Sequence, residues 1–170
     1  MRVFNDDFNK IYSIMEQGFP KSEIRSFSGQ KALLKDSRYK IYCEYDNEEI
    51  IAFIAVWDLC EYKFLEHFAV HPSYRGMGIG SKLLKEVISS LSGLCFLEVE
   101  PPISELQKRR VEFYKRQGFF INVYQYFQPA FSKTLPAVPL KIMTYGKEID
   151  EKEFLKIKNL VYKEVYHQDL

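Results

Sequence analysis

The chain has 170 residues, and its 24 lysines and arginines against 23 aspartates and glutamates give a formal net charge of +1. This balance gives no electrostatic reason to expect nucleic acid or an anionic membrane as the main partner. Apolar residues make up 46% of the chain and aromatic residues 16%, a composition that excludes an intrinsically disordered protein. The length suits one domain, and we expect a single domain over residues 1–170.

Cysteine spacing and hydropathy narrow the class further. The three cysteines, Cys43, Cys60 and Cys95, are odd in number and far apart, so neither a disulfide framework nor a zinc site is predicted. The N-terminus is acidic and lacks the apolar core of a signal peptide. The longest apolar run, residues 50–57, is far shorter than the roughly 20 residues that span a bilayer. We therefore expect a cytoplasmic protein without a bound metal and without a membrane partner.

The first half of the chain changes from a helical to a strand-like period. Apolar residues recur at helical spacing over 6–17, and a second helix is predicted over about 29–37. Residues 40–59 predict an antiparallel hairpin, and residues 62–70 predict a third strand.

The second half continues with alternating elements. They are, in order, a glycine-rich turn over 75–80 that leads into a helix, a strand over 94–99, a helix over about 104–117, two strands over 119–127 and about 136–145, and a helix over 150–166. The whole order, α-α-β-β-β-α-β-α-β-β-α, predicts an α/β sandwich with a mixed sheet.

The glycine turn is the most informative segment. Glycine tolerates positive φ and lets the backbone approach a ligand, and the helix that follows offers N–H groups that suit a phosphate. A tight turn that needs glycine for geometry alone is the alternative. A P-loop fails because Ser81 separates Gly80 from Lys82, and a dinucleotide fingerprint fails because the spacing is G-x-G-x-G instead of G-x-G-x-x-G.

The motif that does fit is R-x-x-G-x-G after a strand, within the run from Phe68 to Leu84. With this run, the sequence resembles the GNAT family of acetyl-CoA-dependent N-acyltransferases. A second family signature, F-Y-x-x-x-G-F, stands at residues 113–119. The element order from residue 1 to about 145 is similar to the family, and the helix over 150–166 lies outside it. The resemblance implies a GNAT-like, mostly antiparallel central sheet flanked by helices, with an extra C-terminal helix.

The resemblance also implies a cofactor site. In this family, backbone amides of the glycine turn bind the coenzyme A pyrophosphate, and backbone groups of a splayed third strand bind the pantetheine arm. The residues implied here are Phe68, Ala69, Val70, Arg75, Gly76, Met77, Gly78, Ile79, Gly80, Ser81 and Lys82.

Tyr114 of the second signature corresponds to a family tyrosine that protonates the leaving thiolate. A phenol suits this task because its pKa near 10 keeps it protonated at neutral pH. The alternative is that Tyr114 is one core aromatic among the 14 Phe, 12 Tyr and one Trp of the chain.

Two glutamates are candidates for the general base that takes the proton of an attacking amine. Period-two alternation places Glu66 on the same face as Phe68 and Val70, with His67 on the opposite face. Glu98, near the end of the next strand, is the other candidate, and either glutamate could instead be a surface or salt-bridging residue.

The leading hypothesis is direct transfer of an acetyl group from acetyl-CoA to the amine of an unidentified small molecule or peptide. A non-catalytic acyl-CoA-binding or interaction module of the same fold is the alternative. We expect residues 19–38 and 128–136 to shape the acceptor site, and the last helix could cover the domain, cap the acceptor cleft or complete a homodimer interface. Part of one aromatic cluster should line the acceptor site or a subunit interface: Phe119, Phe120, Tyr124, Tyr126, Phe127 and Phe131.

The second family helix departs from the common pattern. Many members have an asparagine and a small residue there that contact the cofactor, whereas Gln107 and Arg110 stand at these places here. This difference leaves the cofactor contacts of that helix open.

Overall fold

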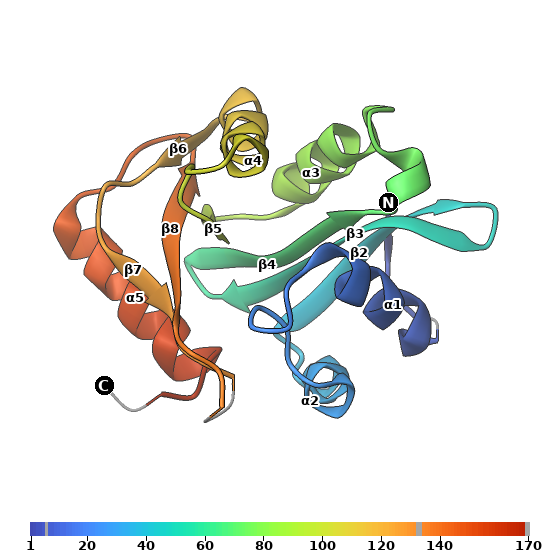
Figure 1. Cartoon of the computed structure of the whole chain (residues 1–170), viewed down its shortest axis with the longest axis horizontal. Coiled ribbons are helices and arrows are strands. Elements are labelled where there is room, and N and C mark those ends of the chain that lie inside the picture. The colour runs from blue at the N-terminus through green and yellow to red at the C-terminus, as the bar shows by residue number, and fades with distance from the viewer. Residues whose placement is uncertain (6, 132–133, 169–170) are drawn as a thin grey trace. The chain divides into compact units, whose positions relative to one another are not determined.

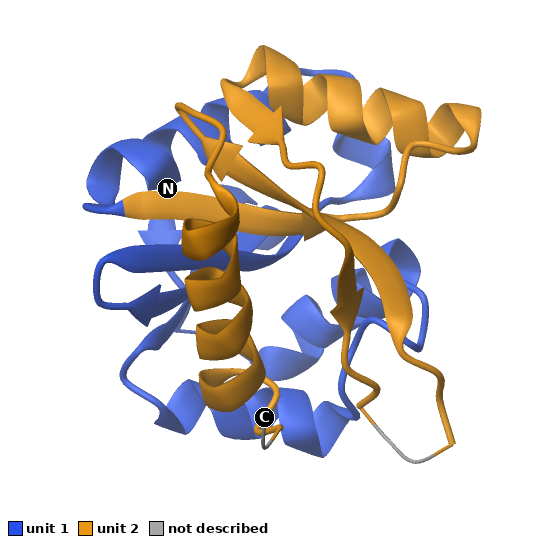
Figure 2. Cartoon of the chain, turned by 90° about the vertical axis from the view of Figure 1, so that its left-hand side faces the viewer, with its two compact units in different colours: residues 1–93 blue, residues 94–170 orange. Residues whose placement is uncertain are grey.

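The computed structural model describes residues 1–5, 7–131 and 134–168. The chain divides into two compact units, residues 1–93 and 94–170, which Figure 2 colours separately. Asp6, where the first expected helix begins, lies outside the described residues, as do Ser132 and Lys133 in the stretch expected to shape the acceptor site.

The first unit is built on four antiparallel strands in the order β1-β2-β3-β4. Its elements are β1 (Arg2–Val3), α1 (Phe8–Gly18), α2 (Phe27–Ala32) with a 3-10 turn at Leu33–Lys35, β2 (Tyr39–Asp46), β3 (Glu49–Leu59), β4 (Tyr62–Val70), a 3-10 turn at Pro72–Tyr74 and α3 (Ile79–Ser90). Helices α1 and α2 lie on one side of the strands and α3 lies on the other (Figure 1). Both faces of β3 are therefore covered, which explains its almost continuous apolar sequence.

A β-bulge at Glu66 interrupts the alternation of β4. Ala55 pairs with His67 while the next residue of β3, Val56, pairs with Leu65, so Glu66 is the extra residue of β4. The carboxylate of Glu66 and the ring of His67 consequently lie on the same side, with His67 Nδ1 3.6 Å from Glu66 Oε2. The expectation that these two side chains point to opposite faces is wrong, because simple alternation does not allow for a bulge.

The second unit is organised around β8, which pairs antiparallel with β5, β6 and β7. Its elements are β5 (Leu94–Val99), α4 (Glu105–Arg116), β6 (Phe119–Ile121), β7 (Tyr126–Gln128), β8 (Val138–Tyr145) and α5 (Glu151–Glu164). Strand pairings within both units are antiparallel and helices flank the strands. The predicted fold class, including the extra C-terminal helix, is confirmed.

Helices α4 and α5 pack on opposite faces of the second unit's strands. Tyr145 of β8 contacts Phe119, which in turn contacts Tyr114 of α4. Tyr126 of β7 pairs with Leu140, whose side chain points away from the face of Tyr145, and the Tyr126 ring packs against Phe154 of α5. Along β5 and β7, successive side chains therefore face α4 and α5 in alternation.

The strand expected over 119–127 is two short strands separated at Asn122. The Asn122 side chain is 4% exposed; its Nδ2 donates to the Ile142 carbonyl and to Thr144 Oγ1, both at 3.1 Å, and its Oδ1 accepts from Ile149 N at 3.0 Å. These tertiary hydrogen bonds have no local sequence signal. Among the residues described, no helix has the length and apolar character required to cross a membrane.

Candidate functional site

The glycine turn connects β4 to α3 with two residues in the left-handed region. Gly76 has φ of 79° and Gly78, the N-cap of α3, has φ of 77°. L-residues rarely adopt this backbone conformation, so both positions favour glycine. A Cβ added at either would meet no atom within 4 Å, and the turn itself is exposed. The backbone of the turn is therefore open to a ligand, next to the N-terminus of α3.

Gly80 is a glycine for a different reason. A Cβ there would lie 3.1 Å from Phe68 Cζ and 3.1 Å from Val70 Cγ2, so the residue allows α3 to approach β4 closely. This contact also shows that Phe68 and Val70 face α3. Of the three glycines, only Gly80 fits the alternative of a packing glycine, whereas Gly76 and Gly78 shape an accessible turn.

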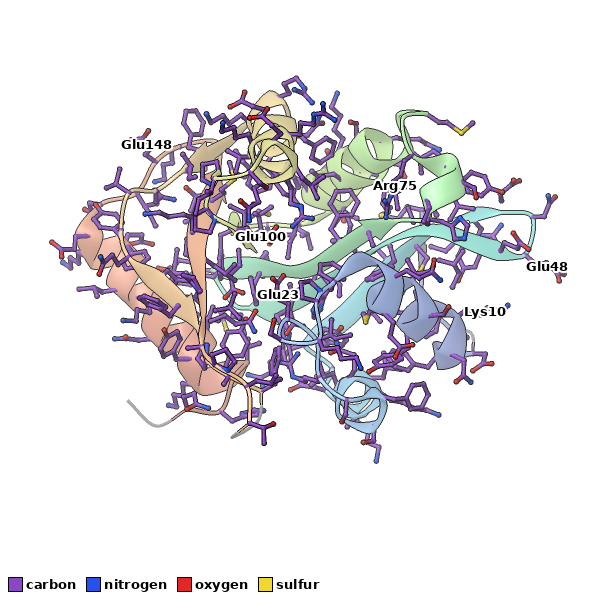
Figure 3. The ribbon with its side chains drawn as sticks, in the orientation of Figure 1. Lys10, Glu23, Glu48, Arg75, Glu100 and Glu148 are labelled. Carbon is purple, nitrogen blue, oxygen red and sulfur yellow. The ribbon has the colours of Figure 1, made fainter. Side chains whose placement is uncertain are left out.

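Two basic side chains of the turn already have partners. Arg75, which precedes α3 in the chain and is labelled in Figure 3, donates from Nε to the Val70 carbonyl at 3.1 Å. Lys82 Nζ donates to Glu44 Oε1 at 2.8 Å, and this hydrogen bond raises the pKa of Lys82. Lys82 is exposed, so its ammonium group can reach a phosphate only in competition with the carboxylate of Glu44.

Glu66 is held as a buried anion. Arg25 Nη1 donates to its Oε1 at 2.5 Å and Trp57 Nε1 donates to its Oε2 at 3.0 Å. Burial alone would raise the pKa of Glu66, but the charges of Arg25 and His67 outweigh burial and hold it at about 2. A carboxylate so stabilised in its charged form is a weak proton acceptor.

The same cluster ties the chain between α1 and α2 to β4. His67 Nε2 donates to the carbonyl of Glu23, which Figure 3 labels, at 3.0 Å. Arg25, two residues further on, carries the ion pair with Glu66. Deeper in the unit, Gln30 Nε2 donates to the hydroxyl of the buried Tyr39 at 2.9 Å. Glu66 and His67 thus anchor a part of the segment expected to shape the acceptor site.

Glu98 of β5 lies in the second unit and accepts hydrogen bonds from two tyrosines. The hydroxyl of Tyr126 donates to its Oε1, and the hydroxyl of Tyr166 donates to its Oε2 at 2.7 Å. Tyr126 is 2% exposed and Tyr166 is 8% exposed, while Glu98 is half-buried. Burial, followed by the nearby Glu98 charge, raises the pKa of Tyr126 well above its ordinary value, so Tyr126 remains a donor.

Tyr114 of α4 is buried against the aromatic end of its motif. Its ring lies 5.7 Å from that of Phe119, and burial raises its pKa to about 12 despite the opposing charge of Arg110. Gly118 ends the helix at φ of 92°, where a Cβ would lie 3.1 Å from the Tyr145 ring. The F-Y-x-x-x-G-F signature is therefore also a helix-ending and packing motif in this chain.

Glu98 and Tyr114 belong to opposite faces of the second unit. Glu98 binds Tyr126 on the α5 face, whereas Tyr114 packs with Phe119 on the α4 face. On the α4 face, the two residues that depart from the family pattern both bind Glu100, which Figure 3 labels at the end of β5. Gln107 additionally completes the capping box of α4 with Ser104. These two side chains support the start of α4.

The sequence-predicted residues thus fall into two sets. Phe68, Ala69, Val70, residues 75–82 and Glu66 lie in the first unit, and Glu98 and Tyr114 lie in the second. The structure adds Arg25 and Trp57 as partners of Glu66, and Tyr126 and Tyr166 as partners of Glu98. Within the described ranges, no group of three or more His, Cys, Asp or Glu side chains could hold a metal ion.

Comparison with known proteins decides the family. Residues 37–120, which contain the glycine turn and the F-Y-x-x-x-G-F motif, match the family model of the acetyltransferase (GNAT) domain. The chain belongs to the GNAT family. No curated protein sequence matches it.

Solved GNAT structures resemble the chain over most of its length. A Bacteroides thetaiotaomicron protein assigned to the GNAT family is 28% identical with a TM-score of 0.86, covering 99% of this chain and 100% of its own. The ribosomal-protein-S18-alanine N-acetyltransferase of Escherichia coli is 20% identical with a TM-score of 0.62, covering 89% and 95%. A GNAT acetyltransferase of Elizabethkingia anophelis with acetyl-CoA bound is 16% identical with a TM-score of 0.62, covering 85% and 95%.

Proposed function

We propose that this protein transfers the acetyl group of acetyl-CoA directly to the amine of a small molecule or peptide. The observation that carries the proposal is the exposed turn at the start of α3, where Gly76 and Gly78 take positive φ and a Cβ at either would project into open space. Such a turn lets backbone amides approach a pyrophosphate, and the N-terminus of α3 adds the positive end of a helix dipole. The acetyl-CoA bound to the Elizabethkingia protein of the same fold supports this ligand.

In this proposal, the cofactor-binding residues are those of the turn and the end of β4. Amides between Arg75 and Lys82 receive the pyrophosphate, and backbone groups at Phe68, Ala69 and Val70 receive the pantetheine arm. The contact of Phe68 and Val70 with Gly80 supports the assignment because it brings the end of β4 and the first turn of α3 together.

Transfer requires that one proton leave the amine and that the sulfur be stabilised as it departs. The amine nitrogen forms a bond to the thioester carbonyl carbon, and the C–S bond breaks with its electron pair on sulfur. A general base takes the amine proton, and the thiolate finally takes a proton, so the products are the acetylated amine and coenzyme A. The chain needs one acceptor and one donor for these two events.

We assign the acceptor to Glu98. Glu66, the other candidate, is in an ion pair with Arg25 that holds its pKa at about 2, which disfavours proton uptake at neutral pH. Glu98 accepts hydrogen bonds from the phenols of Tyr126 and Tyr166, and neutral donors stabilise a carboxylate less than a cation does. Glu66 then has the role of fixing the segment before α2.

We assign the donor to Tyr114. Its pKa of about 12 keeps it protonated at neutral pH, but an ordinary thiol has a pKa near 8.5, so complete transfer from phenol to thiolate would be uphill. Tyr114 therefore acts mainly by donating a hydrogen bond to the developing thiolate.

The decisive experiment follows coenzyme A release from acetyl-CoA with a panel of amines for the parent, Tyr114→Phe and a control, Tyr124→Phe. Tyr124 is another tyrosine of the second unit, and its hydroxyl donates to the Ile149 carbonyl at 3.3 Å. We expect Tyr114→Phe to bind coenzyme A like the parent and to lose roughly 100-fold in kcat, with Tyr124→Phe close to the parent. An unchanged kcat where chemistry limits turnover would contradict the role of Tyr114. Coenzyme A binding without transfer to any amine would instead support the non-catalytic module.

A further inference from the structure

The carboxylate of Glu98 is fixed by two residues that are distant in sequence. Tyr126, 28 residues later, donates to one oxygen from β7, and Tyr166, 68 residues later, donates to the other oxygen from two positions beyond the end of α5. With one donor on each oxygen, rotation of the carboxylate would break at least one hydrogen bond. The Glu98 side chain therefore has a defined orientation.

Aromatic packing fixes the two donors in turn. The Tyr126 ring lies 6.4 Å from that of Phe154 and 5.9 Å from that of Tyr162, both in α5. The Tyr166 ring lies 5.6 Å from that of Phe131, and its backbone N–H donates to the Val161 carbonyl at 3.1 Å. Packing against aromatic side chains thus holds both tyrosines that donate to Glu98 in place.

A general base requires an accepting oxygen that is held in a fixed position. Proton transfer depends on placing the accepting oxygen within hydrogen-bond reach of the donor, and small displacements of the accepting group reduce the rate. Residues that lock a reacting side chain by packing and hydrogen bonds preserve this placement. The extra helix α5 is otherwise unexplained by the reaction, and it supplies Tyr162 and Phe154 as well as the chain that leads to Tyr166.

We propose that Tyr166, together with Tyr126, is a positioning residue for Glu98, which makes the segment at the end of α5 a working part of the acetyl-transfer site. This inference rests on the proposed function and on Glu98 as the proton acceptor. The titratable groups that face Glu98 include Tyr126 from β7 and Tyr162 and Tyr166 from the C-terminal segment.

The test compares Tyr166→Phe with Tyr124→Phe. Each change deletes one phenol hydroxyl from the second unit, but the Tyr124 hydroxyl donates to the Ile149 carbonyl instead of to Glu98. Measurements are kcat and KM for an accepted amine, the dissociation constant of coenzyme A, and kcat/KM against pH. Thermal unfolding of both variants checks that they are folded.

We expect Tyr166→Phe to lower kcat about tenfold with coenzyme A affinity unchanged. In its profile of kcat/KM against pH, the acidic limb should move to higher pH, because loss of the Tyr166 donor disfavours the charged form of the Glu98 carboxylate. Tyr124→Phe should retain the parent values. If Tyr166→Phe does not fold, Tyr126→Phe, which removes the donor to the other oxygen, should give the same loss and the same shift.

The possible failures are distinguishable. A parent that transfers acetyl groups, with Tyr166→Phe matching Tyr124→Phe in kcat and in pH profile, would overturn the positioning role and leave the proposed function intact. A parent that acetylates no amine would overturn both, since there would be no proton transfer for Glu98 to perform.

Discussion

Two glutamates of similar sequence context have opposite environments in this protein. Glu66 is neutralised by a guanidinium group, Arg25, and Glu98 is hydrogen-bonded by the neutral phenols of Tyr126 and Tyr166. A cationic partner stabilises the charged form far more than a neutral donor does, so the first environment suits a structural anion and the second a proton acceptor. Partner identity therefore separates two roles that residue type alone leaves open.

The glycine turn yields a second test at this scale, Gly78→Ala compared with Gly146→Ala. Both glycines have positive φ, 77° and 84°, and a Cβ at either would meet no atom within 4 Å. Both changes should cost about 1–2 kcal/mol of stability, because an L-residue is strained in this conformation. Gly78→Ala should also weaken coenzyme A binding about tenfold or more, because its methyl group occupies the space in which the proposed pyrophosphate lies.

Calorimetric titration with coenzyme A and urea unfolding measure these two effects separately. Equal affinities of the two variants, with both folded, would remove the pyrophosphate from the turn at Gly78. A loss of affinity in Gly146→Ala alone would move the ligand site to the other unit.

At the scale of elements, prediction from sequence succeeds where structure follows from a local period. The third strand over 62–70 and the strand over 94–99 agree with β4 and β5 to the residue, and the F-Y-x-x-x-G-F helix agrees with α4 within one residue at each end. The second helix was expected over about 29–37, but α2 begins at Phe27, after its N-cap Ser26, and ends at Ala32 in a 3-10 turn. The two-residue strand β1 has too little sequence to show a period.

Features that depend on distant partners could not be predicted. The bulge at Glu66 depends on the β3–β4 register, and the ion pair of Glu66 with Arg25 joins residues 41 positions apart. The hydrogen bond from Tyr166 to Glu98 joins residues 68 positions apart. The motifs therefore locate the candidate cofactor residues and Tyr114, whereas the partners that distinguish the two glutamates become visible only in the structure.

Asn122 provides the test at the scale of elements. Its buried side chain joins the end of β6, β8 and the loop before α5 through three hydrogen bonds. Asn122→Ala should lower the free energy of unfolding by about 2–4 kcal/mol, since it leaves buried polar groups without partners. The exposed Asn159 of α5 offers the control, and Asn159→Ala should change stability by less than about 0.5 kcal/mol. Similar stabilities of the two variants in urea titrations would show that this side-chain bridge contributes little.

For the whole molecule, the net charge of +1 limits long-range charge repulsion near neutral pH. The dependence of stability on pH is then governed by individual groups whose pKa differs between the folded and unfolded states. Glu66 is an acidic group of this kind, since its pKa is about 2 in the folded chain against an ordinary value of 4.5.

Acid unfolding of the parent and of Glu66→Gln tests this dependence. Because folding lowers the pKa of Glu66, its ionised form contributes stability above about pH 5, on the order of 3 kcal/mol, and this contribution disappears as pH falls towards 2. The free energies of unfolding of the two proteins should differ most at neutral pH and converge in acid. Glu105→Gln, which removes an exposed partner of Lys108, is the control and should follow the parent throughout. A constant difference between the parent and Glu66→Gln from pH 7 to pH 3 would show that the Arg25–Glu66 ion pair does not lower the pKa of Glu66, and Glu66 would again be a candidate for the base.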